Sequence, residues 1–117
     1  MAIAIYEWSQ IAAEQMTPQL TRQVIYGENM TVARICIEAG VVVAEHHHIS
    51  EEFLLLEQGK ARLSIGGEEK LIAAGQVIRI PSNTAHKFVA IEDCVAIDLF
   101  APGRLDWIRG EDAYLRK

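Results

Sequence analysis

The sequence has 117 residues, half of them apolar and 23% charged, which suits one globular domain (residues 1–117) with a core of its own. Its formal net charge is −5, and no block of lysine or arginine occurs anywhere in the chain. Nucleic acid and anionic membranes are therefore not expected partners, because both require a basic face, whereas small-molecule ligands remain open.

The first ten residues contain no basic leader, and no apolar run approaches the ~18 residues of a membrane span, so we expect a cytoplasmic protein. Cys36 and Cys94 each lie within an apolar run. This placement is typical of buried structural thiols in a reducing compartment.

Short β-like runs separated by turn residues recur along most of the chain. They cover residues 30–38, 41–48, 53–56, 61–65, 70–74, 77–80, 86–91 and 95–100. About eight short strands at this spacing predict an all-β, antiparallel sandwich or barrel. Helix is expected only near the ends, over residues 10–16 with Ser9 as the cap and over residues 104–109.

Three of the four histidines are consecutive, in the stretch Glu-His-His-His-Ile-Ser-Glu-Glu-Phe at residues 45–53. If residues 41–48 form a strand, the side chains alternate between its two faces. His46 and His48 then share one face and can converge on one metal ion, while His47 points away. Imidazole and carboxylate groups are ordinary ligands of transition metals.

The choice between Glu51 and Glu52 is less well determined, because Ile49-Ser50 is expected to bend the chain. Downstream of the bend, one face of the next strand carries Glu52 and the other carries Glu51. The face with Glu52 holds one charge fewer, which favours it slightly for the interior. His86, the only remaining histidine, follows a turn at residues 81–85 and is a candidate for a further ligand.

The spacing of these residues resembles the two sequence motifs of the cupins. The first motif is Gly, five residues, His-X-His, three or four residues, Glu, six residues and Gly, and Gly40 to Gly59 fits it at every position. In the second, Gly75 is followed by five residues, Pro81-Ser82-Asn83, two residues and His86. Here Asn83 stands for the usual Gly, a mild change since Asn tolerates a left-handed backbone, and Ala90 stands for the usual final Asn.

The resemblance implies a cupin double-stranded β-helix, which is an antiparallel jelly-roll barrel, with short helical turns at the ends. It further implies one divalent transition metal ion, of nickel, zinc, manganese or iron. The implied metal ligands are His46, His48, Glu52 and His86.

A finer resemblance concerns the segment from Ile97 to Trp107, which looks like the tail of small single-domain cupins of pectin and uronate breakdown. Those proteins convert 4,5-unsaturated uronates to the linear keto sugar. The resemblance implies Asp98 as general acid/base, Arg104 as the group that holds the substrate carboxylate through a bidentate pair, and Phe100 as part of the pocket wall. Where this chain has Glu52, those cupins often have Gln, which leaves the substrate open.

The leading hypothesis is thus a metal-dependent enzyme acting on a small anionic sugar, and we expect a homodimer with the N-terminal segment as a contributor. The rival hypotheses are an Fe(II)-type dioxygenase, a non-catalytic small-molecule or sugar-binding cupin, and a structural oligomer with a vestigial site. Arg34 and Arg79 are secondary candidates for anion binding, although solvent-facing strand positions suit both equally well.

Overall fold

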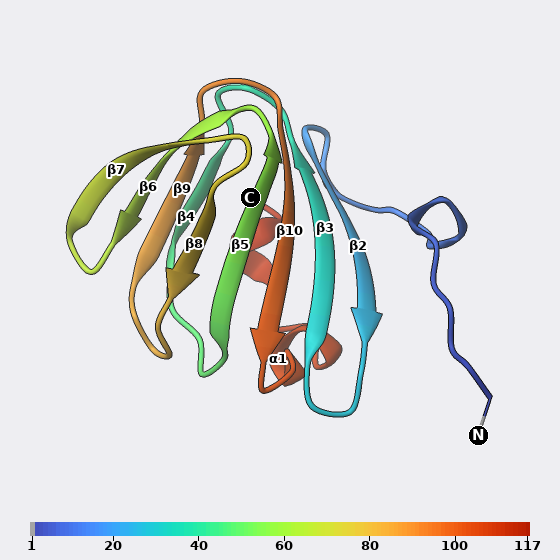
Figure 1. Ribbon diagram of the computed structural model, residues 1–117. Coiled ribbons are helices and arrows are strands. Elements are labelled where there is room, and N and C mark those ends of the chain that lie inside the picture. Colours follow the sequence, from blue (N-terminus) through green and yellow to red (C-terminus); the bar gives the residue numbers. More distant parts are fainter. Residues whose placement is uncertain (1) are drawn as a thin grey trace.

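The computed structural model describes residues 2–117 as two antiparallel sheets that face each other (Figure 1). One sheet has six strands in the order β1-β2-β3-β10-β5-β8, and the other has four in the order β4-β9-β6-β7. The strands are β1 (Glu14–Thr17), β2 (Leu20–Tyr26), β3 (Thr31–Ile37), β4 (Val42–His46), β5 (Glu51–Gln58), β6 (Lys60–Ile65), β7 (Glu68–Ala73), β8 (Val77–Ile80), β9 (His86–Ala90) and β10 (Cys94–Ala101). The predicted antiparallel jelly-roll architecture is confirmed.

Strict alternation of buried and exposed side chains places the core between the two sheets. Along β3 and β10 every second side chain is buried, as expected for strands with one face on the core. Between β6 and β7, Gly66 and Gly67 have φ values of 56° and 86°. Positive φ at both central residues is the signature of the tight hairpin that this dipeptide predicts.

The expected helix over residues 10–16 is wrong. The segment contains a 3₁₀ turn, η1 (Trp8–Gln10), followed by β1, which pairs with β2 in antiparallel register. Tertiary contacts decide this outcome: Met16 points into the core, and Glu14 forms an ion pair of 3.1 Å with the buried Arg22. The strands β1 and β2 were both absent from the sequence-based expectation.

The C-terminal region folds back beneath the end of the sandwich, beside β10 (Figure 1). It consists of α1 (Leu105–Ile108), where a helical turn was expected, and a 3₁₀ turn, η2 (Ala113–Leu115). Trp107 and Leu115 from these two turns are buried in the core. The C-terminal region is therefore an integral part of the packing.

Both cysteines are free thiols, with Cys94 buried and Cys36 half-buried on the outer side of its strand. Among residues 2–117, no helix has the length and apolar character needed to cross a membrane.

Candidate metal centre

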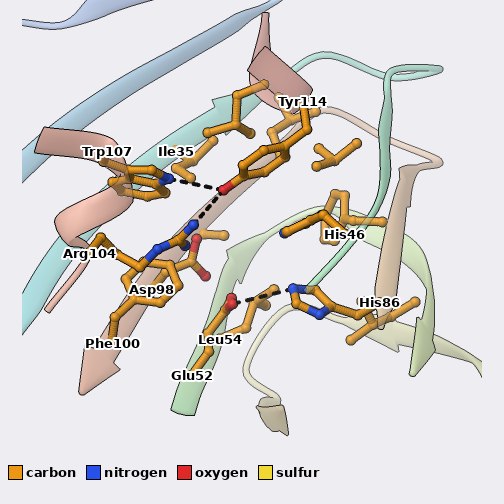
Figure 2. Close-up of a pocket in the computed structure, with 16 residues that line it drawn as sticks. Ile35, His46, Glu52, Leu54, His86, Asp98, Phe100, Arg104, Trp107 and Tyr114 are labelled. Atoms are coloured by element: carbon orange, nitrogen blue, oxygen red, sulfur yellow. Dashed lines mark hydrogen bonds and ion pairs between the residues drawn. The ribbon is translucent and has the colours of Figure 1, made fainter. Parts of the chain in front are cut away.

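A cavity opens between the two sheets next to the C-terminal turns (Figure 2). It brings together six of the seven residues that the sequence singles out. These six are His46, Glu52, His86, Asp98, Phe100 and Arg104. The seventh, His48, lies directly beside them, with its Nε2 atom 3.2 Å from Glu52 Oε1.

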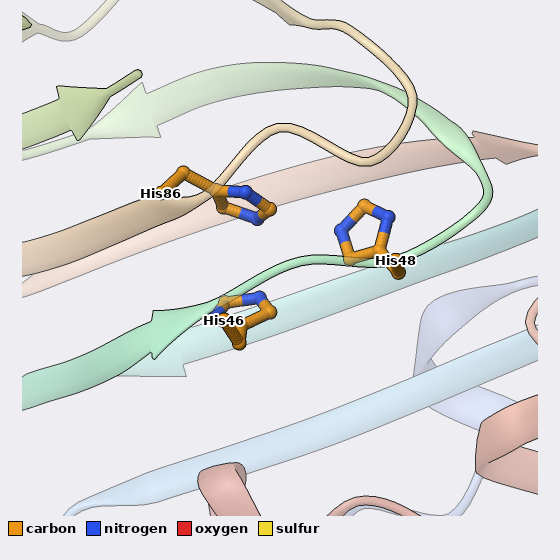
Figure 3. Close-up of side chains that lie close together, drawn as sticks. All are labelled: His46, His48 and His86. Atoms are coloured by element: carbon orange, nitrogen blue, oxygen red, sulfur yellow. The ribbon is translucent and has the colours of Figure 1, made fainter. Parts of the chain in front are cut away.

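His46, His48 and His86 form a compact cluster (Figure 3), in which one ring nitrogen from each residue lies within 4.8 Å of the others. His46 ends β4 and is paired directly with His86, the first residue of β9. His48 follows in the turn between β4 and β5 and is buried, whereas His47 between them is exposed. The cluster is thus built from one strand pair and the turn that leaves it.

An irregularity in β4 is needed to produce this arrangement. Val43 is buried, so uninterrupted alternation would turn His46 outward. The register between β4 and β9 shifts between Val43 and His46, which returns His46 to the inner face. His46 and His48 do share a side, as the alternation argument predicted, but the strand is not continuous over residues 41–48.

Each of the three rings is oriented by a hydrogen bond from Nδ1 to a backbone carbonyl two residues away. The distances are 2.8 Å from His46 to Ala44, 2.8 Å from His48 to Ser50 and 2.7 Å from His86 to Thr84. A carbonyl oxygen only accepts, so Nδ1 carries the proton and Nε2 keeps its free electron pair. This is how metal-binding histidines are held in proteins.

Burial also keeps the three imidazoles neutral, which is the form that binds metals. Desolvation is the largest cause in each case and lowers the pKa of His46 to about 3, and the pKa values of His48 and His86 to about 4. The cluster therefore presents three neutral nitrogen donors at physiological pH. Such a donor set fits a divalent transition ion.

The two neighbouring glutamates have different surroundings. Glu52 is buried, and its Oε1 lies 3.2 Å from His48 Nε2 and 3.7 Å from His86 Nε2. Glu51 points outward and forms an ion pair of 2.7 Å with Arg79 at the surface. Of the two carboxylates, only Glu52 is in a position to join the histidines around one ion.

Asp98 lies beside Glu52 on the inner face of the six-stranded sheet. Because the two carboxyl groups lie close together in a buried site, the protonation of each depends on that of the other. Burial raises the pKa of Glu52 to about 7, and burial together with the Glu52 charge raises the pKa of Asp98 well above its usual value. The Oδ1 atom of Asp98 is buried without a hydrogen-bond partner.

Arg104 is buried between two aromatic rings, with its guanidinium carbon 4.6 Å from the ring centre of Phe100 and 4.3 Å from that of Trp107. Its Nε and Nη2 atoms donate to Asp106 at 2.9 and 2.7 Å. The bidentate face that was expected to hold a substrate carboxylate is thus directed at Asp106. Nη2 also donates to the Tyr114 hydroxyl at 2.9 Å.

Tyr114 and Asp106 are parts of the site that the sequence reasoning missed. Both lie downstream of the motif residues: Tyr114 lines the cavity (Figure 2), and Asp106 acts on the site through its bonds to Arg104. Arg34 and Arg79 both lie on the outer side of their strands, where Arg34 donates to Gln23 and Arg79 pairs with Glu51. Neither arginine lines the cavity.

The sequence matches the family model for a cupin domain over residues 33–100, which is more than half of the chain. The chain belongs to the cupin family. This cupin is 31% identical over 81 residues to an uncharacterised protein of Streptomyces coelicolor, and the match covers 68% of the chain and 77% of the relative.

Two solved structures are similar to this cupin over almost their whole length. KdgF from Halomonas sp. has a TM-score of 0.83 and 23% identity, covering 91% of this chain and 99% of its own. An RmlC-like cupin from Shewanella frigidimarina has a TM-score of 0.84 and 21% identity, covering 91% and 96%. At such identities the likeness shows the fold alone. The family and the cluster of histidines together support a metal-binding cupin.

Proposed function

We propose that this cupin is a metal-dependent enzyme that converts a 4,5-unsaturated uronate to its linear keto form. The observation that carries the proposal is the environment of Asp98. Its carboxyl group is buried, has a raised pKa and keeps an unpartnered oxygen at a cavity lined by His46 and His86 of the three-histidine cluster. A buried carboxyl group with a raised pKa is suited to proton transfer near neutral pH.

We propose His46, His48, His86 and Glu52 as the ligands of one divalent ion. When bound, such an ion polarises hydroxyl and carbonyl oxygens as a Lewis acid. The fit rests on three neutral nitrogen donors with oriented rings and on a carboxylate oxygen within 3.7 Å of two of them.

The proposed reaction is an isomerisation, so no atom is gained or lost. The hydroxyl group on the anomeric carbon loses its proton, the bond between that carbon and the ring oxygen breaks, and the resulting enol gains a proton at carbon. Asp98 in its ionised form accepts the first proton, and in its protonated form it delivers one to carbon. Phe100 and Trp107 keep water away from this transfer, since both rings are buried against the cavity.

The sequence adds support through the tail from Asp98 to Arg104, which resembles that of cupins of uronate breakdown. The test is the loss of ultraviolet absorbance of the unsaturated uronate in the presence of metal-loaded protein, measured against the spontaneous rate. Asp98→Asn keeps the shape of the side chain but cannot exchange the proton, and we expect kcat to fall by about 10²–10⁴-fold.

Glu51→Gln is the matched control, because Glu51 lies outside the cavity and should leave the rate unchanged. An unchanged rate in Asp98→Asn would remove Asp98 from the reaction. Absence of turnover with every tested metal would overturn the proposal, and oxygen consumption by the iron-loaded protein would instead favour an oxygenase. A rise in Tm with a uronate ligand but without turnover would favour a non-catalytic binding protein.

A further inference from the structure

The cavity beside the histidine cluster is small, with a volume of about 50 Å³. A uronate, with its six-membered ring and carboxylate, is larger than this space. A ligand of that class therefore either extends beyond this space or takes the place of a side chain that lines it.

Tyr114, which lies in η2, is one of the side chains that line this cavity (Figure 2). Its ring stacks on the imidazole of His46, with ring centres 4.0 Å apart and planes inclined by 21°. Its hydroxyl oxygen accepts hydrogen bonds from Arg104 Nη2 at 2.9 Å and from Trp107 Nε1 at 3.0 Å. The tyrosine thus combines a flat ring beside a histidine of the cluster with an oxygen held by two donors.

A bound sugar acid would make the same kinds of contact, because it also combines a ring with oxygen atoms that accept hydrogen bonds. Arg104 Nη2 is shared between Tyr114 and Asp106, whereas Trp107 Nε1 donates to the tyrosine. A carboxylate that took the place of the phenol oxygen would gain these two donors. Hydrogen bonds from charged donors to a carboxylate are the stronger kind.

The backbone around Tyr114 is fixed on both sides. Asp112 forms a buried ion pair of 3.0 Å with Arg22, and Leu115 is buried in the core. Displacing the whole segment would break this pair and expose an apolar side chain, which is costly. Rotation of the Tyr114 side chain alone requires neither change.

We propose that Tyr114 is the specificity-determining residue of this site, acting as an internal plug that occupies the place of a sugar-acid ligand. Small carboxylates bind beside it, and uronates bind only when its side chain is displaced. The inference rests on the proposed function for the identity of the larger ligand.

The test measures binding to zinc-loaded protein by calorimetry, with acetate as the small probe and galacturonate as the large one. Galacturonate lacks the reactive double bond, so the result does not depend on turnover. In Tyr114→Ala the space of the ring is vacated, and we expect at least tenfold tighter binding of galacturonate with a smaller change for acetate. Tyr114→Phe is the matched control, because it keeps the ring and loses only the hydroxyl, and galacturonate should still bind weakly.

If the alanine variant does not fold, Tyr114→Leu serves as a second variant that retains more of the packing. Its gain in galacturonate affinity should be intermediate. Equal affinity of the wild-type protein and the folded variants for galacturonate would overturn the role of Tyr114. If the variants bind galacturonate more tightly but none turns over the unsaturated uronate, the proposed reaction is overturned. The role of Tyr114 in ligand binding would still hold.

Discussion

His46, His47 and His48 are adjacent in the chain, but their rings lie in different surroundings. Two of them belong to the cluster, whereas His47 is exposed and lies outside it. We expect about one transition metal ion per chain in protein purified without a histidine tag. His48→Ala and His86→Ala should each remove most of this metal, since each takes away one of three nitrogen donors.

The variant His47→Ala is the matched control, because it removes an imidazole from the same stretch without touching the cluster. Elemental analysis of the variants measures the difference. Full metal content in both ligand variants would contradict the assignment of this centre.

The buried carboxyl group of Glu52 should make metal affinity depend on pH. Its pKa is raised to about 7, chiefly by burial, so below that pH a proton must leave before the carboxylate can bind an ion. In the metal-free protein the same shift stabilises the fold below the ordinary pKa of 4.5, and this contribution is lost as the pH rises through about 7.

We therefore expect metal affinity to fall by roughly tenfold per pH unit below about pH 7 and to level off above it. The Glu52→Gln variant has no proton to lose at this position. Its metal affinity should be weaker and should depend less on pH over the same range. Titrations with a competing chelator at several pH values measure this. Equal pH dependence in the wild-type protein and the variant would show that Glu52 does not bind the ion.

At the scale of structural elements, the turn between β5 and β6 has little tolerance for a side chain. Gly59 has a φ of +92°, and a Cβ atom added to it would lie 2.3 Å from the carbonyl oxygen of Asp93. Gly75→Ala is a matched control, since Gly75 also has a φ of +92° but nothing within 4 Å of such an atom.

Gly75→Ala should cost about 1–2 kcal/mol in the free energy of unfolding, from the backbone conformation alone. Gly59→Ala should cost at least about 3 kcal/mol, because the backbone of the neighbouring turn must also move. Urea titration of both variants measures the difference, and equal costs would contradict the close approach. The last glycine of the first cupin motif thus has a packing reason of its own.

Most strands could be predicted from local patterns because alternation and turn residues act over a few positions. The expected and observed bounds of β8 coincide, and those of β3 and β9 differ only at their ends. At residues 10–16, in contrast, apolar spacing compatible with a helix is overruled by pairing with β2. β1 and β2 form a tight hairpin, in which Thr17 pairs with Leu20, and this pairing outweighs the helical spacing.

The candidate site likewise has parts that the sequence predicted and parts that it did not. The spacings around His46 and His86 indicated a shared metal site, whereas the irregularity in β4 that turns His46 inward left no recognisable pattern. Asn83 has a φ of 55°, the left-handed conformation that the motif position requires, as its substitution for Gly predicted. The contact between Tyr114 and His46 depends on how the C-terminal turns fold back, which only the whole structure shows.

At the scale of the whole molecule, the outer face of the six-stranded sheet carries a continuous apolar patch. Strand register places seven side chains side by side there, namely Ile25, Val32, Phe53, Leu55, Val77, Ile97 and Leu99. The N-terminal arm leaves this sheet at its edge and extends away from the body (Figure 1), with Ile3 and Ile5 exposed by 86% and 80%. Its base is fixed to the same face, since Gln23 donates to the carbonyls of Trp8 and Ile11.

We propose that a second copy of the chain covers this patch, with the two arms reaching across the shared interface. Light scattering after size exclusion should then give twice the mass of the chain. Phe53→Glu places a charge in the patch and should yield monomers. Leu71→Glu is the matched control, because Leu71 is exposed by 64% on the other sheet, and it should leave the mass unchanged. A monomeric wild-type protein would contradict the proposal.

The proposed metal ligands come from both layers of the sandwich: His46 and His86 lie on the four-stranded sheet, and Glu52 lies on the six-stranded sheet. An ion bound by all three side chains would link the two sheets at one position. Amide hydrogens of β5 and β9, which face each other across this point, should then exchange with solvent more slowly after metal is added. Exchange in the β6–β7 hairpin should change little. Hydrogen exchange would then show which strands the bound ion stabilises.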